Sequence, residues 1–168
     1  MARRVWEVVP VTRKHSCSKP PVRRENTNRL DSIPSTLRGE KGDGLKYILV
    51  INDRLPSLND YVNSSRANRN YGNIIMRSAK EIVDIAILQY LRGVRIDNPV
   101  YMRYAWYEPN KKRDLDNISS MGRKIIQDAL VDRMVLQNDG WNEIQGFSDT
   151  FHIDRDNPRV EVVIEVIV

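Results

Sequence analysis

Three aspartates are the residues of this chain whose type and spacing are best suited to chemistry. Asp114 and Asp116 flank Leu115 in the run KKRDLDN, and Asp139 follows in QNDGWNE. In an extended segment alternate side chains point the same way, so both carboxylates would face one side while Leu115 packs inward. Asp139 comes after the next predicted helix and could complete a cluster of three acids.

Carboxylates gathered in this way form a site for a hard divalent cation. Oxygen ligands select Mg²⁺ or Mn²⁺ over softer metals, and Mg²⁺ usually also takes water and substrate phosphate oxygens. Such a site can hydrolyse a phosphodiester, because a bound metal lowers the pKa of its water and stabilises the leaving oxygen. The sequence therefore predicts Mg²⁺, with Mn²⁺ as a substitute, held by Asp114, Asp116 and Asp139.

Cationic and amide side chains surround these acids. Lys111, Lys112 and Arg113 form a basic run that could hold a DNA backbone next to the metal. Lys124, on the following helix, could stabilise charge on the transferring phosphoryl group, so we predict a catalytic role for it. Asn117 could bond a ligand carboxylate or a substrate phosphate.

Each acid also has a structural interpretation. Asp116 lies where a helix N-cap is expected, and its carboxylate would satisfy free amides there. Asp139 belongs to Asn138-Asp139-Gly140, a sequence that forms tight turns for backbone reasons alone. Asp128 fits a helix surface or a residue that supports the ligands better than it fits a ligand. The occurrence of the acids together beside a basic run favours a functional site.

The elements that must position these residues follow from apolar periodicity. We predict strands at 46–51, 100–107, 146–153 and 159–167, and helices at 73–91 and 118–131. The last two strands are separated by a short polar segment, which predicts a hairpin. The order β-α-β-α-β-β predicts an α+β fold, a mixed layer in which helices cover one face of a small mixed sheet.

The segment LPSLNDYVNSSRANRNYG, after the first strand, accumulates polar donors. Asn59, Asn63, Arg66 and Arg69 are residues that a phosphate-facing surface would carry, and they are equally typical of a hydrophilic loop. Both interpretations stay open. On the first of them, these four residues contact DNA.

Charge divides the chain into a basic arm, residues 1–44, and a domain, residues 45–168. Residues 1–46 contain 11 of the 27 Lys and Arg residues but only 5 of the 22 Asp and Glu residues. The rest of the chain therefore holds 16 basic and 17 acidic residues and is nearly neutral. A basic arm suits attraction to a polyanion, although a solvated, unstructured leader has the same composition. The absence of a long apolar run and the single Cys17 predict a cytoplasmic protein.

The runs RDLDN, KIIQDAL and NDGWNEI, in that order and spacing, resemble the RusA family of Holliday-junction resolvases, in particular its phage-borne members. The resemblance covers residues 45–168. It implies a RusA-like fold and a homodimeric, Mg²⁺-dependent crossover-junction endodeoxyribonuclease of DNA recombination and repair, with Asp114, Asp116 and Asp139 as metal ligands. The family's catalytic lysine lies one turn after the second aspartate, where this chain has Ser120. We assign its role to Lys124, one further turn along the same face.

We therefore expect a structure-selective endonuclease that resolves four-way DNA junctions, and two alternatives remain. A junction-binding protein without catalysis is favoured by Ser120 at the lysine position. A phosphohydrolase would form an aspartyl-phosphate on Asp114 with Asp116 as acid or base. The chain lacks room for the extra strands that we would expect in such a phosphohydrolase, so this alternative is the weaker one.

Overall fold

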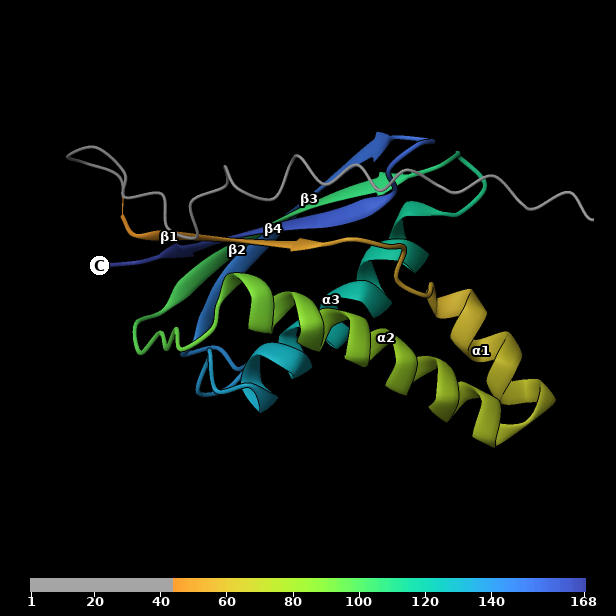
Figure 1. Cartoon of the computed structure of the whole chain (residues 1–168), viewed down its shortest axis with the longest axis horizontal. Coiled ribbons are helices and arrows are strands. Elements are labelled where there is room, and N and C mark those ends of the chain that lie inside the picture. The colour runs from red at the N-terminus through yellow and green to blue at the C-terminus, as the bar shows by residue number, and fades with distance from the viewer. Residues whose placement is uncertain (1–43) are drawn as a thin grey trace, which may run out of the picture. The chain divides into compact units, whose positions relative to one another are not determined.

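The computed structural model describes residues 44–168, so the predicted unstructured arm lies outside the described residues except for Gly44. The elements are β1 (Lys46–Ile51), α1 (Leu58–Ala67), α2 (Arg69–Tyr90), β2 (Val100–Glu108), α3 (Leu115–Asp132), β3 (Ile144–Ile153) and β4 (Arg159–Val166). Figure 1 shows the helices on one face of a four-stranded mixed sheet, which confirms the predicted α+β class. None of the helices in residues 44–168 is long and apolar enough to cross a membrane.

The strand order is β1-β4-β2-β3, and the predicted hairpin between the last two strands is wrong. β4 pairs antiparallel with both β1 and β2, whereas β3 pairs with β2 alone, in parallel. The reason lies in the apolar content of the two strands. β4 buries Val160, Val162 and Ile164 and suits the interior of the sheet, whereas β3 has no fully buried residue and suits its edge.

Two helices replace the single helix that we predicted between the first two strands. α1 occupies the polar segment that we interpreted as a loop or a phosphate-facing surface, so the loop interpretation is wrong. It begins with a capping box in which Ser57 accepts from the Asp60 amide at 3.3 Å and Asp60 accepts from the Ser57 amide at 2.9 Å. α1 buries none of its residues completely, and Leu58, Tyr61 and Val62 are too few apolar positions for periodicity to reveal the helix.

The core places the start of α3 beside the end of β2. Alternate residues of β2, from Val100 to Trp106, are almost completely buried under α3 and its neighbours. Gly122 marks the closest approach, because a Cβ added there would lie 2.4 Å from the Trp106 ring. Only a glycine lets α3 pack at this depth on the sheet.

Candidate active site

Asp114 and Asp116 lie at the N-terminal end of α3, and both are exposed. Asp114 is the N-cap residue, and its Oδ2 accepts a hydrogen bond from the Asn117 side chain at 3.1 Å. Asp116 lies in the first helical turn, and Leu115 is 56% exposed. The predicted extended geometry is therefore wrong, because the helix already begins at Leu115. The helix dipole favours both carboxylates at this end.

A cavity of about 480 Å³ adjoins Asp114. Lys111 and Asn110 line it from the loop before α3, and His152 lines it from the end of β3. The His152 ring stacks on Tyr107 with centroids 4.8 Å apart, and its Nε2 lies 3.2 Å from the Thr150 hydroxyl. Sequence analysis missed His152, because only the parallel pairing of β2 and β3 brings it to this edge.

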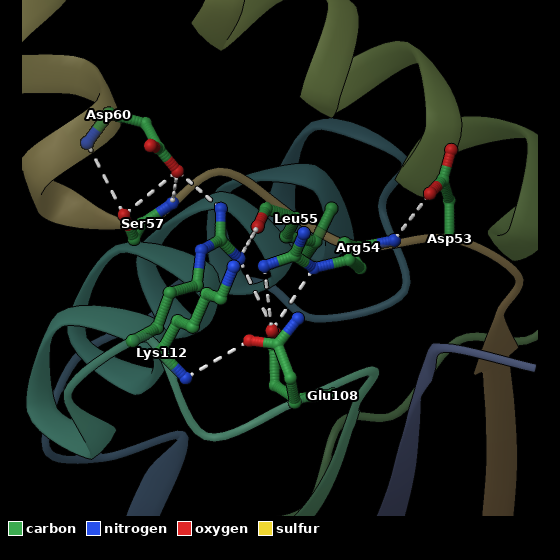
Figure 2. A network of polar contacts seen from close by, with 9 residues as sticks. Asp53, Arg54, Leu55, Ser57, Asp60, Glu108 and Lys112 are labelled. Carbon is green, nitrogen blue, oxygen red and sulfur yellow. Dashed lines mark hydrogen bonds and ion pairs between the residues drawn. The ribbon is translucent and has the colours of Figure 1, made fainter. Parts of the chain in front are cut away.

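A buried carboxylate, that of Glu108 at the end of β2, holds this region together. Arg54 donates to Glu108 Oε2 from Nε at 3.0 Å and from Nη2 at 2.8 Å, as Figure 2 shows. Arg113 donates to Oε1 at 3.3 Å, and Glu108 itself is 7% exposed. Glu108 was not singled out from the sequence. It continues the inward positions of β2, and this alternation is the signal that could have identified a buried acid in need of cationic partners.

Arg113, just before α3, connects this segment to the end of β2 and to the start of α1. Besides Glu108, it donates to the Leu55 carbonyl oxygen at 3.0 Å and forms an ion pair with Asp60 in the first turn of α1. Partial burial raises the pKa of Asp60, but hydrogen bonds from Ser57 and the charge of Arg113 outweigh it and hold the pKa below its usual value. The Arg113 side chain, predicted to contact DNA, is thus engaged within the protein and only 19% exposed.

Other residues predicted to contact DNA are exposed around the same end of α3. Lys111 and Lys112 lie in the loop before it, where the Lys112 amide donates to the Asn110 side chain at 3.0 Å. On α1, Asn59, Asn63 and Arg66 recur at helical spacing and share one exposed face. Arg69, also exposed, is the first residue of α2, and Asn117 is half-buried against Asp114.

Lys124, in the second half of α3, forms an ion pair with Asp139, which lies between α3 and β3. The Lys124 ammonium lies 2.6 Å from Asp128 Oδ1, one turn later on the helix, and 3.4 Å from Asp139 Oδ2. The hydrogen bond with Asp128 is the main cause that raises the pKa of Lys124, so its positive charge persists at neutral pH. The amide of Asp139 bonds the Asn138 side chain at 3.0 Å, which supports the predicted turn as well.

The structure brings Lys124 to Asp139, but it does not bring Asp139 to the other two aspartates. Asp116, Ser120, Lys124 and Asp128 form one row of α3, and eight residues separate Asp116 from Lys124, a rise of about 12 Å. Within residues 44–168 no group of three or more His, Cys, Asp or Glu side chains could hold a metal ion. Asp114 and Asp116 still suit Mg²⁺, since one or two carboxylates and substrate phosphates usually hold it.

Compared with known proteins, the chain matches no family model, and no curated protein matches it at a significant level.

Proposed function

We propose that this chain is a Mg²⁺-dependent endonuclease that cuts four-way DNA junctions as a homodimer, in the cytoplasm of a bacterial or phage-infected cell. The observation that carries the proposal is the pair of exposed carboxylates, Asp114 and Asp116, at a helix start anchored by the buried Glu108. The adjoining cavity of about 480 Å³ and the exposed Lys111 and Lys112 add support. The resemblance of RDLDN, KIIQDAL and NDGWNEI to the RusA family supports the choice of substrate.

In this proposal Asp114 and Asp116 would hold Mg²⁺, and the bound ion would supply Lewis-acid activation of water and charge neutralisation at the scissile phosphate. Lys111 and Lys112 hold the DNA backbone beside the carboxylates. Lys124 acts as a fixed positive charge and not as a base, because a lysine ammonium is protonated at neutral pH and the hydrogen bond with Asp128 raises its pKa further.

Around this centre, the exposed polar face of α1 extends the backbone contact. Asp139 pairs with Lys124 and orients its ammonium.

A labelled four-way junction incubated with Mg²⁺ tests the proposal. We expect paired nicks from the wild type and at least about a 100-fold slower reaction from Asp114→Asn or Asp116→Asn, because each removes one ligand charge. Junction binding in EDTA should be retained by both variants. Asp156→Asn, at an exposed position between β3 and β4, is the matched control and should cut normally. The proposal is wrong if junctions stay intact after incubation with the wild-type protein, or if Asp116→Asn cuts them at the wild-type rate.

A second candidate is a junction-binding protein without catalysis. The separation between the α3 start and the Lys124–Asp139 pair favours it, because no third carboxylate among residues 44–168 joins Asp114 and Asp116 in a metal-binding group. If this candidate is correct, the chain should bind the junction tightly and form no cleavage product with Mg²⁺ or Mn²⁺ at saturating protein concentration. Product formation in a single turnover would reject it.

A further inference from the structure

One face of α2 is apolar yet lies open to solvent. Tyr71, Ile74, Ile85 and Leu88 are 57%, 55%, 65% and 50% exposed. The opposite face of the same helix is the one that enters the core, through residues such as Val83 and Ile87. Within residues 44–168, folding of one copy therefore leaves these four large side chains exposed.

The open residues follow the spacing of a helix-pairing seam. With the exposed Ser78 and Glu81 between them, they occupy positions 71, 74, 78, 81, 85 and 88, alternately three and four residues apart. This is the spacing of a coiled coil, and it spans about 25 Å of helix. Singly exposed apolar residues are ordinary, whereas two apolar pairs repeated at this spacing on one face of a helix indicate an interaction surface. We call these six positions the α2 stripe.

The α2 stripe is also symmetric about its centre. Tyr71 lies as far before the midpoint as Leu88 lies after it, Ile74 mirrors Ile85, and Ser78 mirrors Glu81. If two α2 helices pair antiparallel, each apolar residue therefore faces an apolar residue, and each Ser78 faces a Glu81 whose carboxylate can accept a hydrogen bond from the Ser78 hydroxyl. A two-fold interface requires such a self-complementary surface, whereas an unrelated partner does not.

We propose that the α2 stripe is a two-fold interface in which α2 helices of two copies of this chain pair antiparallel. The inference rests on the proposed function for the role of the dimer, and it names the surface that forms it. Dimerisation can be measured without any DNA. The interface proposal can therefore be wrong while the nuclease proposal is right, and the nuclease proposal can be wrong while the interface proposal is right.

The buried side of α2 links this surface to the candidate site. Lys80 forms an ion pair with Asp132 at the end of α3, and Arg133 Nη2 lies 2.9 Å from Asp84 Oδ2. Because α2 is fixed to α3 in this way, antiparallel pairing sets the relative positions of the two α3 helices. Two equivalent sites then address the two equivalent strands of a symmetric junction.

Sedimentation equilibrium of the full-length chain, from low to high micromolar concentration, tests the interface. We expect a wild-type dimer and roughly a 100-fold or greater rise in its dissociation constant for Ile85→Glu, since the charge enters the seam twice. Met134→Glu, at a 68% exposed position after α3, is the matched control and should leave the dimer intact. A monomeric wild type, or an Ile85→Glu dimer of unchanged affinity, would overturn the proposal.

Charge pairing tests the register. Ile74→Glu combined with Ile85→Lys in one chain places opposite charges across both halves of an antiparallel seam and should restore the dimer. Ile74→Glu combined with Ile85→Glu should stay monomeric. Parallel pairing predicts no restoration by the first combination, so that result would overturn the antiparallel arrangement. Circular dichroism melting checks that every variant folds, which we expect because both side chains are more than half exposed.

Discussion

The surroundings of the N-terminal end of α3 and of its second half, the far end, contain the same kinds of charged residue in opposite environments. At the N-terminal end, the side chains of Glu108 and Arg113 are 9% and 19% exposed and bridge several elements. At the far end, those of Lys124 and Asp128 are 59% and 40% exposed and make an ion pair within one helix. Breaking a buried pair leaves an uncompensated charge, whereas an exposed pair contributes little to stability. The first end is therefore built to hold its geometry, and the second is free to adjust its charges to a ligand.

The largest effect should come from Glu108→Gln. We expect the free energy of unfolding to fall by about 3 kcal/mol, because Arg54 and Arg113 lose the carboxylate that compensates them. Chemical denaturation of the full-length chain measures this. Asp128→Asn is the matched control, and its loss should stay below about 1 kcal/mol. Equal losses would show that the two ends of α3 do not differ as their burial indicates.

Gly122→Ala tests the contact that joins the two ends to the sheet. The new methyl group would meet the Trp106 ring at 2.4 Å, so α3 must shift, and we expect a loss of about 2 kcal/mol. Ser120→Ala, an exposed change in the same helix, should alter stability by less than about 0.5 kcal/mol. Thermal melting of both variants makes the comparison, and a neutral Gly122→Ala would mean that α3 does not pack this closely.

The strands and the longer helices could be predicted from the sequence because apolar residues alone determine them. Alternation in β2 and helical spacing in α3 locate these elements to within a few residues. α1 escaped prediction because it has no completely buried residue, although Ser57 and Asp60 already offered a capping signal. The pairing of the last two strands was also predicted wrongly, because a short connection favours a hairpin. The position of β4 between β1 and β2 depends on the whole sheet and cannot be read from the local sequence.

The residues of the candidate site could be proposed from the sequence, but their geometry could not. The pairing of Lys124 with Asp139 follows their assignment to one site, but their distance from Asp116 depends on an unbroken α3. Arg113 shows the other difficulty. Its charge suggested a phosphate contact, and only the fold shows that Glu108 and Asp60 engage it.

Asp60→Asn should have an intermediate effect that depends on pH. We expect a loss of about 1 kcal/mol at neutral pH, because the variant loses the capping carboxylate and the charge that pairs with Arg113. Since folding lowers the pKa of Asp60, its contribution is complete above the unfolded pKa of about 4 and disappears as pH falls through the folded value. Melting temperatures of wild type and variant should thus converge below about pH 4. A gap that persists at pH 2 would contradict this origin.

The smallest effect on stability, and a large one on activity, should come from Lys124→Met. The exposed ion pairs of Lys124 contribute less than about 0.5 kcal/mol, so the melting temperature should barely change. Because folding raises the pKa of Lys124 above its ordinary 10.5, this contribution is present below pH 10.5 and disappears only as pH rises through the folded value. Junction cleavage should nevertheless slow by about 100-fold or more, since a fixed positive charge near the phosphate is lost. Arg95→Met, which breaks an exposed ion pair with Asp97 in the segment before β2, is the control and should leave cleavage unchanged. If Lys124→Met cut junctions at the wild-type rate, the far end of α3 would have no role in catalysis. Its two ends would then differ only in how much their ion pairs contribute to stability.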